Sequence, residues 1–348
     1  GLQFWVSPLL GQIAEKFPET DISLIQMLVT APAIVSVFVA LGCGWLCTKV
    51  SKKNLLLLAA LISGFTGIMP WFRDSFELLF FSRIIYGIAL GLATTLNTAV
   101  VADFFQEKER VTAMGIQAAS IGAGMVFITT VAGKAGTVEY RQASWLNALG
   151  FLAFVVIMIC LPEKNRKERK AGTIRLNSEV WITSVFGFLE FFFLITFSTN
   201  IAIHLSGALE GNSTVSGILT GAFSGIQIVA GFILGSVTKR TGKLTLSAAM
   251  LSFSLGVCFL LLFPSRLQML FIGALLCGFS QGIFIPTGMV AVANAADTTS
   301  CAMASAVFTC AMSLGQFLSP TILNKVAGTL LGEITTENVF IIAASGMT

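Results

Sequence analysis

Charged residues are scarce in this chain, and this scarcity already limits what kind of protein it can be. They make up 11% of the 348 residues, whereas 55% are hydrophobic and the mean hydropathy is +0.87. A soluble domain carries about 25% charged residues. The composition therefore excludes an ordinary water-soluble protein and predicts a chain embedded in the lipid bilayer.

Side chains for metal, redox and nucleotide chemistry are also few or dispersed. The chain has a single histidine, His204, and its seven cysteines are scattered through apolar segments, where they are expected to be small buried hydrophobic residues. The sequence shows no nucleotide-binding loop, no nucleophile with a matching base and no metal-ligand spacing. We therefore expect neither an enzyme nor a cofactor, and we attribute the net charge of +4 to loops beside the membrane rather than to a nucleic-acid site.

The chain contains instead a series of apolar runs of about 20 residues, the length that a helix needs to cross the hydrocarbon. The runs at the two ends look cut, so we expect half a helix to be missing at each end, and we expect the first run not to be preceded by a signal peptide. The predicted helical segments cover residues 1–14, 22–47, 54–72, 76–101, 110–133, 142–162, 179–206, 213–238, 244–263, 267–293, 300–327 and from 338 onward.

The distribution of Lys and Arg predicts the orientation in the membrane. The loops after the second, fourth, sixth and eighth segments hold fourteen of these residues, and the loops on the other side hold six. Cytoplasmic loops are enriched in Lys and Arg, so the first group is placed in the cytoplasm. We expect a multi-pass protein of a bacterial plasma membrane.

The two halves of the sequence repeat. The run Gly44–Lys52 resembles Gly235–Lys243, which lies 191 residues later. Parallel six-helix repeats predict a pseudo-two-fold axis along the membrane normal, with the substrate path between the halves. We expect an N-terminal bundle at 1–162, a cytoplasmic linker at 163–178 and a C-terminal bundle at 179–348. The same offset relates the expected helix-packing glycines Gly87 to Gly278 and Gly91 to Gly282.

Two motifs carry a resemblance to a known family. Arg83-x-x-x-Gly87-x-x-x-Gly91 matches that family's fourth-helix signature completely. The family's loop signature between helices 2 and 3 is matched at Gly44, Lys49, Lys52 and Lys53, with Thr48 in place of an aspartate and Ser51 in place of the second glycine. In these residues the chain resembles the major facilitator superfamily of transporters, and the resemblance covers essentially its whole length.

The resemblance implies an all-α membrane protein of two six-helix bundles, with twelve helices when intact. It also implies that a small-molecule substrate crosses the bilayer with the proton gradient as the energy source, and we expect a monomer. Ser313–Pro320 resembles helix 11 of bacterial drug-efflux members. Exporting members usually carry a Gly-Pro-rich fifth helix, whereas Gly115–Gly124 has no proline, so the direction of transport stays open.

The basic loop and its repeat are candidate gates. Lysines at the lipid–water boundary can lock one half against the other in one access state, although they can equally serve only to set topology. The family's aspartate would supply a fixed charge for the lock, and Thr48 lacks it. The candidate gating residues are Gly44, Lys49, Lys52, Lys53, Gly235, Lys239, Arg240, Gly242 and Lys243.

Arg83 is a cation inside an apolar helix, where insertion costs about 2.5–3.5 kcal/mol and where such residues usually face a polar cavity. Thr94 and Asn97 lie on the same helix face, which gives that helix a polar stripe. Two interpretations remain: Arg83 takes part in proton or substrate coupling, or it pairs with backbone carbonyls for structure alone. Its repeat position is occupied by Ala274, so it is an asymmetric addition to the shared architecture.

Glu190 is the only acid well inside an apolar segment, about 16 Å from the end of its helix at 1.5 Å per residue. A carboxyl group there can bind or release a proton as its hydration changes, which is what proton coupling requires. The alternatives are a permanently protonated acid bonded to a neighbouring helix, or direct substrate contact. Further candidates for the substrate cavity are Thr94, Asn97, Gln117, Asn200, His204, Gln281 and Gln316.

These observations favour a proton-coupled secondary transporter that exports small amphipathic organic compounds by alternating access. The first rival is a proton-coupled uptake symporter for a metabolite, which would need converging charges in the cavity. The second is a non-transporting membrane receptor, which predicts loss of one copy of the gating loop, whereas both copies are recognisable.

Overall fold

The computed structural model describes residues 2–47, 49–105, 107–163, 177–208, 212–295 and 301–348, and these ranges are helical apart from short connections. The helices follow the predicted segments closely. They are η1 (Leu2–Leu9), α1 (Leu10–Lys16), α2 (Ile22–Leu46), α3 (Lys52–Phe72), α4 (Phe76–Phe104), α5 (Glu107–Ala135), α6 (Tyr140–Ser144), η2 (Trp145–Ala148), α7 (Leu149–Cys160), α8 (Ser178–Ala208), α9 (Ser213–Thr241), η3 (Gly242–Leu244), α10 (Thr245–Leu262), α11 (Leu267–Ala295), α12 (Cys301–Leu330) and α13 (Thr336–Gly346).

Two predicted segments are not single α-helices. The first starts as the 3-10 helix η1, which contains Pro8. The sixth is divided into α6, η2 and α7. At that point Ser144 donates a hydrogen bond of 2.7 Å to the carbonyl oxygen of Gly67 on α3, and a Cβ atom on Gly67 would lie 2.7 Å from that of Asn147. The close approach of α3 accompanies the local change of helix type, which hydropathy cannot reveal.

Nine helices in the described part of the chain are long and apolar enough to cross a membrane, and Ser120–Ala135 forms a shorter apolar stretch. Local signals set where several of them begin. The hydroxyl groups of Ser51, Ser75 and Thr335 accept hydrogen bonds from backbone N–H groups three residues later, which caps α3, α4 and α13. Asn212 caps α9 in the same manner. The protein is therefore a multi-pass membrane protein.

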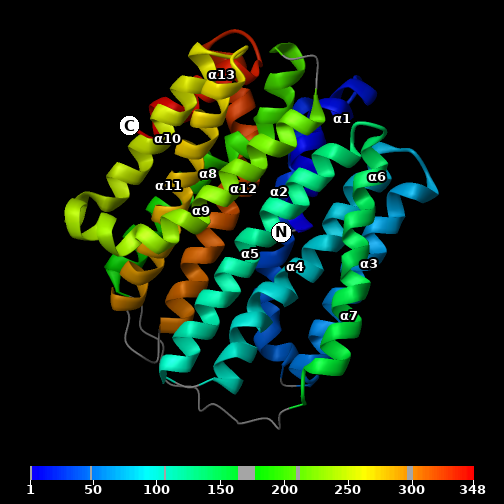
Figure 1. The fold of residues 1–348 in the computed structure, drawn as a ribbon, viewed down its shortest axis with the longest axis vertical. Coiled ribbons are helices and arrows are strands. Elements are labelled where there is room, and N and C mark those ends of the chain that lie inside the picture. The colour runs from blue at the N-terminus through cyan, green and yellow to red at the C-terminus, as the bar shows by residue number, and fades with distance from the viewer. Residues whose placement is uncertain (1, 48, 106, 164–176, 209–211, 296–300) are drawn as a thin grey trace.

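We call the helices up to α7 the first half and those from α8 onward the second half. Figure 1 shows α3, α4, α6 and α7 on the right and α9, α10, α11 and α13 on the left. The end that carries the α2–α3 and α9–α10 connections is called the basic side, because Lys52, Lys53, Lys239 and Arg240 lie there. The other end is called the opposite side.

Corresponding glycines pack on corresponding helices in the two halves. A Cβ atom on Gly87 of α4 would meet the carbonyl oxygen of Pro32 on α2, and one on Gly278 of α11 would meet that of Phe223 on α9. Phe223 lies 191 residues after Pro32, so the contact itself repeats at the offset of the sequence. Three further contacts repeat in the same way. Gly87–Val35 corresponds to Gly278–Ile226, Gly91–Ser36 corresponds to Gly282–Gln227, and Gly91–Val39 corresponds to Gly282–Ala230.

One hydrogen bond joins two residues that are themselves repeat partners. The hydroxyl group of Ser7 donates to the carbonyl oxygen of Ser198 over 2.5 Å, and the two residues are 191 positions apart. A contact between equivalent residues lies at the axis that relates the two repeats. It places η1 and α8 at the centre of the molecule.

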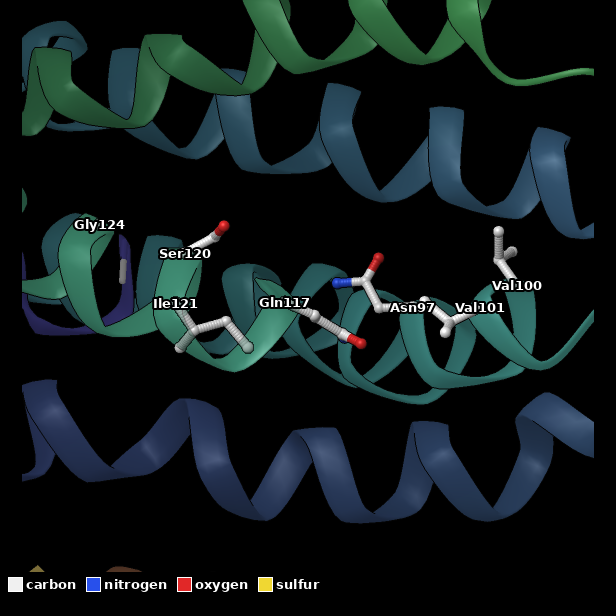
Figure 2. A pocket seen from close by; sticks show the side chains of 7 residues that line it. All are labelled: Asn97, Val100, Val101, Gln117, Ser120, Ile121 and Gly124. Atoms are coloured by element: carbon white, nitrogen blue, oxygen red, sulfur yellow. The ribbon is translucent and has the colours of Figure 1, made fainter. Parts of the chain in front are cut away.

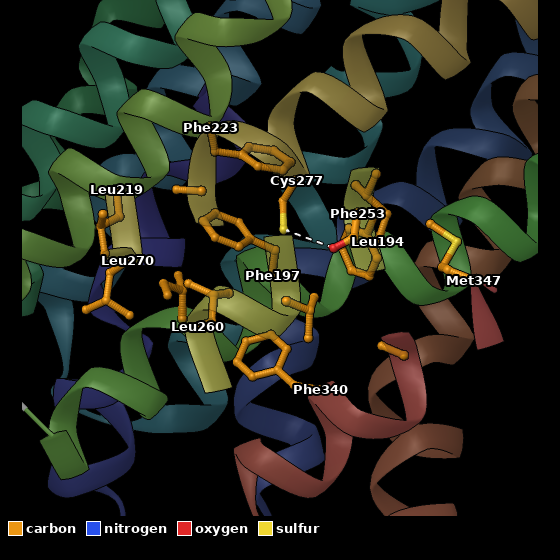
Figure 3. Close-up of a cluster of buried hydrophobic side chains, with 14 of the residues drawn as sticks. Leu194, Phe197, Leu219, Phe223, Phe253, Leu260, Leu270, Cys277, Phe340 and Met347 are labelled. Atoms are coloured by element: carbon orange, nitrogen blue, oxygen red, sulfur yellow. Dashed lines mark hydrogen bonds between the residues drawn. The ribbon is translucent and has the colours of Figure 1, made fainter. Parts of the chain in front are cut away.

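A large buried cluster lies in the second half (Figure 3). The rings of Phe197 on α8 and Phe223 on α9 stack with their centres 4.6 Å apart. The thiol group of Cys277 on α11 donates to the carbonyl oxygen of Phe253 on α10 over 3.8 Å, shown as a dashed line. Cys277 is thus a buried packing residue, as expected for the cysteines, whereas Cys160 and Cys258 are exposed and the expectation was wrong for them. The cluster joins α8, α9, α10 and α11 into one packed unit.

An ionic cluster links three connections on the opposite side of the first half. Asp74 pairs with Lys16 and accepts a hydrogen bond of 2.6 Å from the hydroxyl group of Tyr140. Glu139 lies 3.7 Å from Lys16 and 2.5 Å from Arg141. Burial favours the neutral carboxyl group, but the hydrogen bonds from Lys16 and Tyr140 outweigh it and hold the pKa of Asp74 below its ordinary 3.8.

The lowered pKa of Asp74 predicts a pH-dependent contribution to stability. Because the folded pKa lies below the unfolded one, the contribution is present above pH 3.8 and is lost as the pH falls through the folded value. The side chains of Lys16 and Asp74 are 36% and 33% exposed, so we expect at most about 1 kcal/mol. The unfolding temperatures of the purified protein and of Asp74→Asn should differ near neutral pH and become equal in acid. A difference that stays the same at every pH would contradict the prediction.

Candidate functional site

Glu190 lies at the interface of α8 and α11 and is completely buried. One carboxyl oxygen, Oε1, accepts a hydrogen bond of 3.1 Å from the hydroxyl group of Ser280 on α11. The other, Oε2, has no partner among the described residues. A buried carboxylate with one unpaired oxygen is costly, whereas a protonated carboxyl group is tolerated. The surroundings can therefore hold a proton on Glu190.

Arg83 is also buried, with 1% of its surface exposed, and its partners are backbone groups. Its Nε donates to the carbonyl oxygen of Leu28 on α2 over 2.8 Å, and its Nη2 donates to that of Gln3 on η1. The guanidinium carbon lies 5.0 Å from the ring centre of Tyr86 and 5.8 Å from that of Trp5. These contacts correspond to the interpretation in which Arg83 joins neighbouring helices through their carbonyl groups.

One nitrogen of the guanidinium group has no acceptor among the described residues. Within the described part of the chain Nη1 of Arg83 has no hydrogen-bond partner, and neither Arg83 nor Glu190 forms an ion pair there. The two residues belong to different halves and do not neutralise each other. Each is thus a separate buried ionisable group with unused hydrogen-bonding capacity.

Asn97 and Gln117 come together at one cavity of about 440 Å³ between α4 and α5. Figure 2 shows their amide groups near each other, with Ser120 of α5 on the same cavity. Thr94 is not among the lining residues; its hydroxyl group donates to the carbonyl oxygen of Leu90 on its own helix over 2.8 Å. The expected polar stripe of α4 thus reaches the cavity through Asn97. The other lining residues are Val100, Val101, Ile121 and Gly124.

Two of the remaining amides expected at the substrate cavity lie in the second half. The side chain of Gln281 on α11 accepts a hydrogen bond of 2.7 Å from Gln227 on α9. Gln316 on α12 is 6% exposed, and its Nε2 has no partner among the described residues. Gln316 is therefore the amide of this pair that remains free to bind a ligand group.

Asn200 and His204 lie away from the cavity between α4 and α5. His204 is buried; its Nδ1 lies 3.0 Å from the hydroxyl oxygen of Thr336, and its ring meets the edge of Phe340 on α13. Asn200 is hydrogen-bonded to Gln26 of α2. Both side chains form contacts between helices. Their spacing of one helical turn had placed them at the substrate cavity and did not indicate these contacts.

The candidate gating residues lie on the basic side. The ammonium group of Lys53 donates to the carbonyl oxygen of Met158 on α7 over 3.0 Å, which holds α3 to α7 within the first half. Gly242 ends α9 with a φ of 53°, a conformation that favours glycine. Lys239 and Arg240 are exposed at the end of α9, Gly235 is exposed within it, and Lys49 is exposed beside the half-buried Lys52. The surroundings of Gly44, the side chain of Lys243 and all of Thr48 lie outside what the structure describes.

The sequence interpretation missed several polar residues. Ser280, Gln26 and Asn324 were not singled out, although Ser280 contacts Glu190 and the two amides bond to each other. The available signal was an isolated amide or hydroxyl group in an apolar segment. That signal is shared by many Ser and Thr residues, which mostly satisfy themselves on their own helix.

A multi-pass helical bundle with an internal repeat and buried ionisable groups is typical of membrane transporters. Comparison with known families identifies which family of transporters the chain belongs to. The model of the Major Facilitator Superfamily matches residues 2–189 and again residues 180–347. The chain belongs to the Major Facilitator Superfamily. It is accordingly a transporter with the all-α fold of that family, and not an enzyme.

Individual relatives are distant. The quinolone resistance protein NorA of Staphylococcus aureus is 25% identical over 254 residues, which are 69% of this chain and 64% of NorA. The match thus spans less than two thirds of that relative. The multidrug transporter AQR1 of Candida glabrata is 24% identical over 172 residues, 47% of this chain and 29% of the relative.

Solved structures share the fold. The nucleoside transporter NupG superposes with a TM-score of 0.79 at 16% identity, covering 99% of this chain and 94% of the other. A D-xylose–proton symporter gives 0.74 at 14% identity, with 99% and 93% covered. At these identities the similarity establishes the architecture alone.

Proposed function

We propose that this protein is a proton-driven exporter of small amphipathic organic compounds that works by alternating access between the two halves. The observation that carries the proton coupling is Glu190, a fully buried carboxyl group with one oxygen unpaired. Such a group binds a proton when buried and releases it when water reaches it. The relatives named for quinolone resistance and multidrug transport favour export of drug-like compounds.

The proposed substrate contacts are Asn97 and Gln117, because they line one cavity with Ser120 and with apolar side chains. Amide groups bind the polar part of an amphipathic compound, and valine and isoleucine bind its apolar part. Gln316, with its free Nε2, is the proposed contact from the second half. The domain division at 163–178 and the cytoplasmic position of the basic side belong to the same proposal.

Proton-coupled uptake of a metabolite is the second candidate. It is favoured by the absence of a proline from Gly115–Gly124, where exporters usually carry one, and by the fold shared with a D-xylose–proton symporter. The two candidates differ in one measurable property. In an exporter of this kind, protons and substrate move in opposite directions, and in a symporter they move together.

Transport by the purified protein in liposomes tests the proposal. A pH gradient is imposed in either direction, and the movement of cationic dyes and of common metabolites is followed. We expect dye to move against the proton flow, with the effect abolished by a protonophore and absent from protein-free liposomes. Movement of a metabolite together with protons would establish uptake, and transport indifferent to the gradient would refute proton coupling.

A further inference from the structure

A chain of amide hydrogen bonds connects the two halves on the opposite side. Gln26 on α2 donates through Nε2 to Oδ1 of Asn200 on α8 over 2.7 Å. Its own Oε1 accepts from Nδ2 of Asn324 on α12 over 2.8 Å, and the same nitrogen lies 3.0 Å from the hydroxyl oxygen of Ser23. The three amides are 1–2% exposed. Gln26 thus belongs to the first half, and the amides of both its partners come from the second.

In a second seam between the halves, the described residues in contact are glycines and a serine rather than side-chain amides. A Cβ atom on Gly133 of α5 would lie 2.7 Å from the Cα of Gly217 on α9, so the two backbones touch. The hydroxyl group of Ser213 donates to the carbonyl oxygen of Gly133 over 2.8 Å. This glycine seam brings the backbones of α5 and α9 into direct contact.

The two seams are equivalent under the internal repeat. Gly217 lies 191 residues after Gln26, and Asn324 lies 191 residues after Gly133. The contact between α2 and α12 is therefore the counterpart of the contact between α5 and α9. One copy is closed by backbone packing and the other by hydrogen bonds between amides.

The same helix faces separate toward the basic side. On α9 the face that contacts α5 includes Gly217, Gly221 and Ile228, but Phe232, one turn further, is 82% exposed. On α2 the face that carries the buried Gln26 and Thr30 continues toward the basic side to Leu41, which is 62% exposed. The halves therefore meet on the opposite side and diverge on the basic side.

We propose that the amide chain Asn200–Gln26–Asn324 is a latch that holds the opposite side closed and thereby sets the balance between the two access states. In the closed state the amides are buried and depend on one another, because an unpaired buried amide is costly. In the open state water satisfies the same groups, so the latch can release without leaving them unpaired. Among the described residues the glycine seam has one such contact, the hydroxyl group of Ser213, and otherwise rests on backbone packing, which makes the amide seam the more adjustable one.

The proposal rests on the proposed function only in assuming that the halves alternate, and its test needs neither a substrate nor a proton gradient. Thr30 lies one turn below Gln26 and is fully buried, so Thr30→Cys reports whether the opposite side is open. A membrane-impermeant maleimide is applied from that side to membrane vesicles. The protein without the added cysteine gives the background from the native thiols.

Adding Gln26→Met to Thr30→Cys keeps the length of the side chain but removes both hydrogen bonds of the latch. We expect the rate of maleimide labelling to rise about tenfold, because two buried amides lose their partners only in the closed state. The matched control is Gln227→Met. It removes a hydrogen bond between two side-chain amides within the second half, and its length of 2.7 Å equals that between Gln26 and Asn200. We expect this control to leave the labelling of Thr30→Cys unchanged.

A reciprocal probe separates opening from local loosening. Phe232→Cys, read with maleimide on the basic side, should label several-fold more slowly when Gln26→Met is added, since opening one side closes the other. Two results would overturn the latch. In the first, Gln26→Met labels Thr30→Cys no faster than the Gln227→Met control does. In the second, Gln26→Met raises the labelling rate of Thr30→Cys without lowering that of Phe232→Cys. If Gln26→Met does not reach the membrane, Asn324→Leu takes its place. Labelling of Thr30→Cys and Phe232→Cys is then measured and judged in the same way.

Discussion

Replacing Glu190 with glutamine is expected to abolish accumulation driven by a pH gradient, with a fall of at least about tenfold. Glutamine has the same size and can still accept the hydrogen bond from Ser280 through its Oε1, so the packing between α8 and α11 is kept. It cannot bind and release a proton, and substrate movement then loses its coupling. The measurement is dye transport in liposomes with the imposed gradient present and absent.

Two comparisons make the result specific to coupling. Glu179→Gln, at the exposed start of the same helix, should transport as the unaltered protein does. Glu190→Gln should retain substrate exchange without a gradient, because the cavity residues Asn97 and Gln117 are untouched. Full gradient-driven accumulation in Glu190→Gln would show that the carboxyl group is a permanently protonated structural group.

The same assay decides the role of Arg83. Its Nε and Nη2 donate to carbonyl oxygens on two different elements, α2 and η1, and a lysine has one nitrogen in place of this fork. If Arg83 takes part in coupling, Arg83→Lys should keep substrate binding and lose turnover. Unchanged transport would leave Arg83 as a link between helices.

Gly278→Ala is expected to destabilise the protein by about 1–3 kcal/mol, the range for overpacking a tight contact. The added methyl group would meet the carbonyl oxygen of Phe223 and lie 2.5 Å from Cγ2 of Ile226. A backbone carbonyl of a neighbouring helix cannot turn aside, so α11 and α9 must separate. Gly87→Ala should have a similar effect in the first half, where the methyl group meets Pro32 and Val35.

Thermal unfolding in detergent measures these effects. Gly231→Ala on α9 is the matched control, because a Cβ atom there has nothing within 4 Å. We expect its unfolding temperature to equal or slightly exceed that of the unaltered protein, because alanine favours the helix, with Gly278→Ala and Gly87→Ala both clearly lower. A Gly278→Ala protein as stable as the control would mean that the two helices adjust to the contact without strain.

Local chemistry made most of the fold predictable. Apolar length and turn residues gave segment positions that agree with α2, α3 and α9 to within a few residues, because crossing the hydrocarbon needs a helix of a definite length. The division of the sixth segment at Trp145–Ala148 was missed. The division coincides with the close approach of Gly67 on another helix, and hydropathy carries no information about neighbours.

The candidate site was predictable only in part, for the same reason. Glu190 stood out because an acid is rare in an apolar helix, and Asn97 and Gln117 stood out as isolated amides. Their partners did not: Ser280 resembles the many serines of these helices, and Gln26 and Asn324 are 298 residues apart. Which of many weakly polar residues meet is a property of how distant helices are placed.

The sequence by itself determined the order and approximate positions of most helices, the repeat at an offset of 191 residues and the membership of a transporter family. These properties follow from composition and spacing along one chain. Only the tertiary structure decided that Arg83 bonds to carbonyl groups rather than to Glu190, that the repeated glycines meet repeated carbonyls, and that one seam between the halves is closed by amides. Each of those contacts depends on the distance between separate helices, which local residue patterns do not encode.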